Sequence, residues 1–247
     1  RDVTGVQTCA LPILLGEVRE VVSWTNRPFY PPWREPVGSF NKPDHSKFLP
    51  VVPKSLNWDA WLSVAQPREY DPAYLPWKWR GWWDFGTGAL GDIACHYFDP
   101  VFRALKLGAP SSVEASSTRV NAETYPLGSM ITYEFPARGS MPPVRLVWYD
   151  GGLRPPRPEQ VRDGDLLGDN GHILVGDRGL IVSSNWPTWQ LYPEKLAREY
   201  GEPPKKLPRS PGHHQEWINA CKGGATAGDG RRGDAVATSI ISHFTGY

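Results

Sequence analysis

Hydrophobic and polar residues alternate along several short segments of the 247-residue chain, which is the pattern of half-buried strands. The first segment, residues 17–25, is rich in β-branched side chains. Beyond residue 110 the alternation returns, and Gly-Asp-Arg-Gly at 176–179 is a strong hairpin-turn signal. We therefore expect strands over residues 17–25, 112–119, 129–135, 144–149 and 171–183 (interrupted by the turn), with a short edge strand at 189–192.

Between residues 90 and 107 the apolar period changes to that of a helix with one buried face. Gly-Ala-Pro at 108–110 predicts the end of this helix. Asn57 is placed to cap a short helix that ends before Pro67, and residues 213–220 predict a further helix. A long helix followed by a run of strands predicts an α+β fold, with an open, mostly antiparallel sheet and helices packed on one face.

The richest chemistry lies in residues 77–99, which contain four tryptophans, an arginine, a glycine-rich turn and an Asp-x-x-x-His pair. Helical spacing places Asp92 and His96 on one face, one turn apart. A carboxylate that orients an imidazole is a common acid/base arrangement, whereas the plain alternative is an ion pair on a helix surface. Asp99 shares this face and would permit a metal site in principle, but we expect no metal.

The same segment contains a literal G-x-G-x-x-G, with Glu114 at about the interval of a ribose-binding acid. A dinucleotide fingerprint follows a buried, β-branched strand, whereas the residues before this one are Arg-Gly-Trp-Trp-Asp-Phe. Asp92 would also bring negative charge to the helix start, where the pyrophosphate should lie. We therefore reject a phosphate-binding loop here.

Composition excludes some classes of function. A net charge of +1 gives no reason to expect nucleic acid or an anionic membrane as partner. No apolar run approaches the length of a membrane span, and three separated cysteines match neither a zinc pattern nor a disulfide framework. The proline- and aromatic-rich residues 27–53 predict an ordered loop or lid.

From about residue 16 to 224 the chain resembles the C-terminal domain of the Gfo/Idh/MocA oxidoreductase family, closest to a bacterial subgroup. The resemblance lies in RGWWDFGTGALGDIACH at 80–96, YDGG at 149–152, VGDRG at 175–179 and GHHQEWINACKGG at 212–224. It implies the α+β sheet domain predicted above, an exposed sheet face used for homo-oligomers, and an N-terminal Rossmann domain that binds NAD or NADP. We expect residues 1–13, which resemble translated sequencing-adapter sequence, to be an artefactual leader. Residues 14–225 would be the substrate and catalytic domain, and residues 226–247 a divergent or truncated tail.

The resemblance also implies roles for individual residues. His96 would be the acid/base on a sugar hydroxyl, with Asp92 as its orienting partner. Carbohydrate binding is expected from a further set, and Gly86 and Gly88 would lie near the nicotinamide. The expected substrate-binding residues are Arg80, Trp79, Trp82, Trp83, Asp99 and His213.

The sequence thus predicts the substrate half of an NAD(P)-dependent oxidoreductase that acts on a sugar, polyol or related carbohydrate by hydride transfer. We expect it to be inactive by itself and not to bind NAD(P) tightly, because it lacks a pyrophosphate-binding loop. Two alternatives stay open. One is an NAD-assisted glycosidase or lyase acting through a transient keto-sugar, and the other is a non-catalytic carbohydrate-binding module. The compartment is not indicated.

Overall fold

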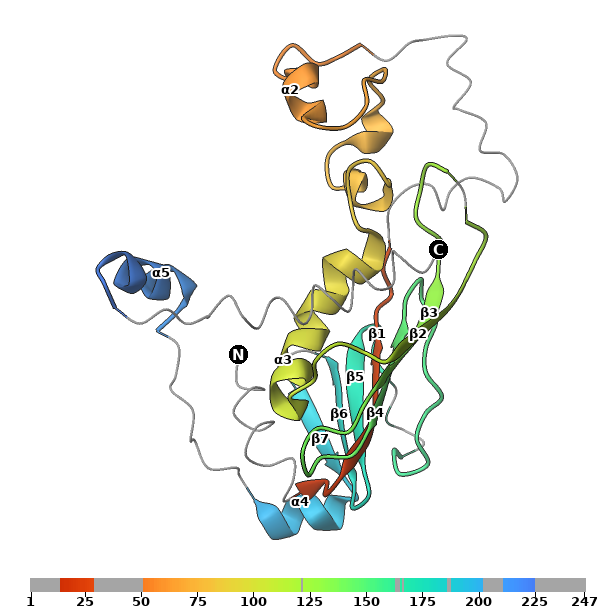
Figure 1. Ribbon diagram of the computed structural model, residues 1–247, viewed down its shortest axis with the longest axis vertical. Helices are drawn as coiled ribbons and strands as arrows, with labels where there is room; N and C mark the ends of the chain where they lie inside the picture. The colour runs from red at the N-terminus through yellow and green to blue at the C-terminus, as the bar shows by residue number, and fades with distance from the viewer. Residues whose placement is uncertain are drawn as a thin grey trace.

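The computed structural model describes residues 14–28, 51–120, 122–162, 165, 167–185, 188–201 and 211–224. The predicted leader, most of the predicted lid and the predicted tail lie outside these residues. Within them, one sheet of seven strands has the order β2-β3-β4-β1-β5-β6-β7 (Figure 1). The strands are β1 Val18–Trp24, β2 Ser112–Ser117, β3 Ser129–Phe135, β4 Val144–Tyr149, β5 Gly171–Gly176, β6 Leu180–Asn185 and β7 Thr188–Tyr192.

The sheet is mostly antiparallel, as the sequence predicts. Its one parallel pair joins β1 to β4, with Val21 opposite Leu146, while the other neighbours run antiparallel. The first strand therefore inserts between segments that lie more than a hundred residues later in the chain. The end of β1 is consequently held at the centre of the sheet, between β4 and β5.

The helical elements fall into two groups. One group lies between β1 and β2, and the other follows β7. They are α2 Trp58–Leu62, the 3-10 helices η1 Pro72–Tyr74 and η2 Lys78–Gly81, the π-helix η3 Leu90–Ala94, α3 Cys95–Leu105, α4 Glu194–Tyr200 and α5 His213–Cys221. Asn57 caps α2 as predicted, since its side chain accepts from the Ala60 amide at 3.0 Å. In the described residues no helix has the length and apolarity needed to span a bilayer.

Helix α3 lies along one face of the sheet and makes the main core with it (Figure 1). Phe98, Val101, Phe102 and Leu105 are buried on it against apolar residues of β1, β3, β4 and β5. The helix ends earlier than predicted, because Lys106 takes up the left-handed conformation (φ 52°) before the Gly-Ala-Pro signal is reached. Helix α4 was not predicted, since seven residues are too few to show a clear helical period.

The opposite face differs from the bare apolar surface expected from a sheet with helices on one side. A second buried cluster, which includes Trp24 and Ile173, lies over β1, β5, β6 and β7. The loop that follows β4 covers it with Val161 and Leu167. Over β2, β3 and β4 this face is mixed, since Glu134 pairs there with Arg145 at 3.6 Å while Met130 and Tyr149 lie opposite each other. This side of the sheet is therefore not one contiguous exposed apolar surface.

Candidate active site

The Asp92–His96 pair lies where η3 passes into α3. The first turn of the predicted helix is a π-turn, a feature often found at functional sites, and its start is fixed by burial of Leu90 and Ala94 in the core. Asp92 is partly exposed and His96 is exposed. Pro100 has no N–H, so the carbonyl of His96 lacks the usual helical donor four residues on. This turn therefore presents an imidazole and a carboxylate to solvent at the start of a buried helix.

Arg80 links the aromatic segment to this turn. Its Nε donates to Asp92 Oδ1 at 3.0 Å, and its Nη1 donates to the carbonyl of Trp77 at 3.2 Å. Its guanidinium carbon lies 4.5 Å from the ring centroid of Trp77 and 4.5 Å from that of Trp79. Asp84, which is closer to Arg80 in sequence than Asp92 is, pairs with Arg68 instead.

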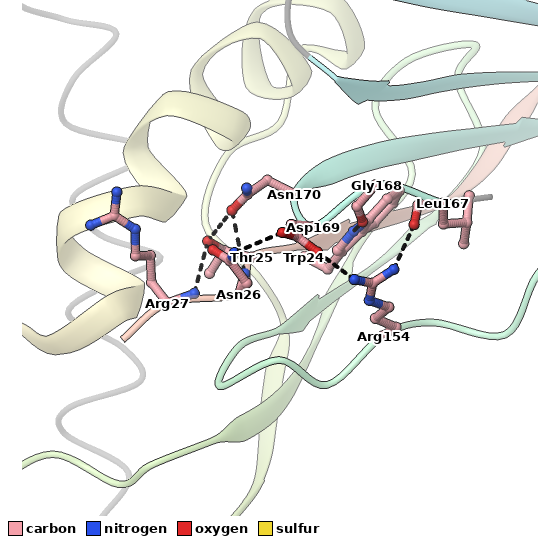
Figure 2. A network of polar contacts seen from close by, with 9 residues as sticks. All are labelled: Trp24, Thr25, Asn26, Arg27, Arg154, Leu167, Gly168, Asp169 and Asn170. Atoms are coloured by element: carbon pink, nitrogen blue, oxygen red, sulfur yellow. Dashed lines mark hydrogen bonds and ion pairs between the residues drawn. The ribbon is translucent and has the colours of Figure 1, made fainter. Parts of the chain in front are cut away.

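Arg27 reaches the same place from the end of β1. Its guanidinium carbon lies 5.9 Å from the Trp77 ring centroid. The backbone that carries it is tied down: its amide donates to Thr25 Oγ1, and its carbonyl accepts from the Gly151 amide. Figure 2 shows the Arg27 side chain pointing away from the polar network that holds this strand end.

That network anchors the strand end to the loop that covers the second apolar cluster (Figure 2). Thr25 Oγ1 donates to Asn170 Oδ1 at 2.5 Å, and Asn26 Nδ2 donates to Asp169 Oδ2 at 3.2 Å. Arg154 closes the loop by pairing with Asp169 at 2.5 Å. The position of Arg27 over Trp77 is thus set by contacts between β1 and the residues just before β5.

The glycines of GTGALG are explained by packing within the chain. A Cβ on Gly86 would lie 2.5 Å from the Arg80 backbone, and one on Gly88, at φ +62°, would lie 2.7 Å from the Tyr125 ring. Tyr125 also donates its hydroxyl to the Gly86 carbonyl at 3.0 Å. The segment follows a 3-10 helix and an isolated bridge at Trp82 rather than a strand. These residues therefore form a tight turn into η3 and do not fit a pyrophosphate-binding loop.

The predicted sugar-binding tryptophans separate into two groups. Trp79 stacks on Arg80 beside Asp92, whereas Trp82 is packed edge-on against Tyr74 at 4.7 Å, and its Nε1 donates to the Ala73 carbonyl. Trp83 lies 3.8 Å from the ring of Tyr125. Trp82 and Trp83 thus support the fold around the turn, and the aromatic residue that faces solvent beside Arg80 is Trp77.

Two other predicted site residues, Asp99 and His213, are not among the residues that contact Arg80 in the described structure. Asp99 forms a helix-surface pair with Arg103 at 3.7 Å on α3. His213 begins α5, which Figure 1 shows apart from the sheet, and its side chain lies outside what the structure describes. Across the described part of the chain, no group of three His, Cys, Asp or Glu side chains is arranged to hold a metal ion.

Two buried titratable groups lie in the sheet near the site. His172 on β5 is fully buried and packs edge-on against Tyr97, the neighbour of His96, and burial lowers its pKa to about 4. Asp150 follows β4 and accepts hydrogen bonds from Ser129 and from Trp148 Nε1, and burial raises its pKa to about 6. Neither was predicted, because only the strand pairing places them inside the core.

Sequence reasoning also missed Arg27 and Trp77 as site residues. They are fifty residues apart, and nothing in their local sequence joins them. Trp77 carries one local signal in the structure, a positive φ of 70°, which is rare for a bulky residue and is typical of functional positions. The carbonyl contact from Arg80 helps to hold it there.

Comparison with known proteins agrees with this architecture. Residues 42–137 match the Gfo/Idh/MocA model described as "Oxidoreductase family, C-terminal alpha/beta domain". The matched segment contains the aromatic region, the Asp92–His96 turn, α3 and the first two strands that follow it. Over these residues the chain is therefore similar to the C-terminal sheet domain of the Gfo/Idh/MocA oxidoreductase family.

One solved structure shares the fold at low sequence identity, and a second aligns more weakly. An NAD-binding protein from Listeria innocua aligns with a TM-score of 0.55 and 11% identity, over 99% of this chain and 61% of its own. An oxidoreductase from Thermotoga maritima aligns with a TM-score of 0.44 and 12% identity, over 98% of this chain and 55% of its own. The chain thus spans a little over half the length of these two structures. No curated protein matches the sequence.

Proposed function

We propose that this chain is the substrate-binding and catalytic half of an NAD(P)-dependent oxidoreductase that acts on a sugar, polyol or related carbohydrate. The observation that carries the proposal is the half-exposed turn at the start of α3, where Asp92 is held by Arg80 and His96 faces solvent. The match to an oxidoreductase-family model and the stacked Trp79–Arg80–Trp77 arrangement support it.

The proposed chemistry uses each of these groups for one task. His96 takes the proton of the reacting hydroxyl, or returns it in the reverse direction, because imidazole exchanges protons readily near neutral pH. Asp92, one helical turn before His96, would orient the imidazole, and Arg80 fixes its carboxylate in place. Trp77 offers its exposed ring to the C–H face of a carbohydrate.

NAD or NADP would supply the hydride acceptor or donor when bound. The described residues do not fit its pyrophosphate, since the GTGALG glycines pack against Arg80 and Tyr125. We propose that the cofactor is held mainly by a separate N-terminal domain, and that Gly86 and Gly88 lie near its nicotinamide. A fluorescence titration of NADH into this chain should show no micromolar binding, and micromolar binding would mean that the loop was wrongly rejected.

A non-catalytic carbohydrate-binding module accounts less well for the structure. Such a module needs a row of exposed aromatic residues on its surface. In the described residues the strongly exposed aromatic side chains are Trp77, before η2, and Trp217, on α5, and these elements lie apart in Figure 1. The other described tryptophans with recorded ring contacts pack within the chain.

Self-association through the sheet is a further part of the proposal. The outer face of β2, β3 and β4 is the part of the sheet that the covering loop leaves open, and it carries the Glu134–Arg145 pair together with the exposed Met130. A self-complementary pairing of such a polar face is expected to be salt-dependent. Light scattering at low and high salt tests this, and a strict monomer at high protein concentration in low salt would contradict it.

The catalytic assignment is tested in the protein joined to its NAD(P)-binding domain, by following NAD(P)H absorbance with a panel of sugars, polyols and sugar acids. His96→Ala should lower kcat about 10²–10⁴-fold with little change in substrate binding. The control is Lys195→Gln on α4, where the side chain is 80% exposed, and it should leave kcat unchanged. Near-normal turnover in His96→Ala would make the pair structural.

A further inference from the structure

Trp77, Arg27 and Arg80 form one surface beside the Asp92–His96 turn, which we call the Arg27–Trp77–Arg80 surface. Two guanidinium groups, from segments fifty residues apart, approach a single indole ring at 5.9 Å and 4.5 Å. More than half of Trp77, 57% of its surface, nevertheless stays exposed. A large apolar ring flanked by two cations and open to solvent is the form of a binding surface rather than of a core contact.

The hydrogen bonds of Arg80 leave one edge of its guanidinium available. Nε donates to Asp92 and Nη1 donates to the Trp77 carbonyl, whereas Nη2 donates to none of the described residues. Because Arg80 is stacked between two indole rings and fixed by two hydrogen bonds, Nη2 is held in a set direction. A guanidinium N–H held in this way favours an anionic oxygen, such as that of a carboxylate or a phosphate.

We infer that the Arg27–Trp77–Arg80 surface binds a carboxylate carried by the substrate, so that the preferred substrate is a sugar acid or a related hydroxy acid. This inference rests on the proposed function, since it names the substrate class of the same site. The carboxylate contacts Arg80 Nη2, with Arg27 as a second cation, while the carbon skeleton lies on Trp77 and a hydroxyl faces His96. A phosphate is disfavoured because the Asp92 carboxylate, 3.0 Å from Arg80 Nε, repels a dianion more strongly than a monoanion.

The test is a binding titration of this chain alone, without NAD(P), with D-glucuronate, D-glucose and D-glucose 6-phosphate followed by ligand-observed NMR. Glucuronate should bind about 10- to 100-fold more tightly than glucose, as expected of a charge-assisted hydrogen bond. Arg80→Met and, independently, Arg27→Met should reduce this preference, whereas Trp77→Ala should weaken glucuronate and glucose alike. Lys195→Gln should change neither.

Equal affinity for glucuronate and glucose, no binding of either, or a preference for glucose 6-phosphate over glucuronate would each overturn the carboxylate assignment. A glucuronate preference that survives both arginine substitutions would overturn its location. Since no hydride transfer is measured, a protein that binds glucuronate selectively but catalyses no redox reaction would contradict the proposed function and leave the binding inference standing. Circular dichroism of each variant identifies any that fail to fold, and the second arginine variant then decides.

Discussion

Arg68 and Arg80 make nearly the same kind of contact within one tryptophan-rich stretch, yet they belong to different kinds of structure. Arg68 lies 5.4 Å from the rings of Tyr74 and Phe85 and pairs with Asp84 at 2.5 Å. Arg80 lies 4.5 Å from two indole rings and pairs with Asp92 at 3.0 Å. Their side chains are similarly buried, at 23% and 21% exposure, so burial does not distinguish them.

The difference lies in what surrounds the rings. Tyr74 and Phe85 contact each other, and they are joined to a larger cluster that includes Trp58, Trp61 and Trp82. Trp77 and Trp79 make no ring–ring contact with other described aromatic residues, and Trp77 is largely exposed. An arginine within a closed set of rings stabilises the fold, whereas one stacked on exposed rings leaves an edge for a ligand.

The largest expected effect comes from removing each arginine in turn. Arg68→Met should lower the free energy of unfolding by about 1–3 kcal/mol, because it removes the cation beside Asp84 and opens the closed ring cluster of Tyr74 and Phe85. Arg80→Met should cost less than about 1 kcal/mol, because the Trp77 ring on which it lies is largely exposed. Urea denaturation of both variants measures the contrast. Equal losses would show that the two clusters are both structural.

Asp150 and His172, which lie outside the Arg68 and Arg80 ring contacts, offer a second contrast, because they make the free energy of unfolding depend on pH in opposite directions. The folded protein holds a proton on Asp150 that the unfolded chain loses between about pH 4 and 6, so this group makes stability fall as pH rises. His172 has the opposite effect on stability. Between about pH 6.5 and 4 the unfolded chain binds a proton that buried His172 excludes, so stability falls as pH drops. Each effect is at most about 3 kcal/mol.

Single substitutions should separate these opposing contributions. In Asp150→Asn, stability should rise more steeply between pH 4 and 6.5 than in the natural chain, because the His172 contribution is then unopposed. In His172→Phe, stability should instead fall over the same range. Thermal unfolding at several pH values measures both slopes. Parallel curves for all three proteins would mean that neither group titrates as its burial indicates.

A smaller and more selective effect is expected from the two aspartates. Asp92→Asn should lower kcat about 10- to 100-fold, because the imidazole loses its neighbouring charge and Arg80 loses its anchor. Asp84→Asn should leave kcat within about twofold while lowering the melting temperature, since its carboxylate serves only Arg68 among the described contacts. A kinetic loss in Asp84→Asn as large as that in Asp92→Asn would remove the distinction between the two regions.

The sequence was most informative where a contact is local. Alternation in β3 and β4 predicted both strands to the residue, and the Asn57 cap predicted the start of α2. The helix C-terminus was missed because Lys106, and not Gly108, adopts the left-handed conformation. The parallel β1–β4 pair and the loop over the second apolar cluster depend on pairing between distant segments, which no local pattern encodes.

The candidate site shows the same limit. Asp92, His96 and Arg80 could be singled out because they fall within one short segment. Composition could not show which tryptophans have ring partners, so Trp82 and Trp83 were grouped with Trp79 although their rings pack against Tyr74 and Tyr125. Arg27 joins the site only because β1 ends at the centre of the sheet, beside the loop that precedes β5.

The central claim is that His96 exchanges a proton with the substrate hydroxyl. The most direct measurement is the pH dependence of kcat/KM for the chain joined to the proposed NAD(P)-binding domain, compared with that of His96→Ala. The natural protein should show an ionisation in this profile, and the variant should lose that ionisation together with most of its rate. An unchanged ionisation in His96→Ala would contradict the account and move the proton transfer to another group.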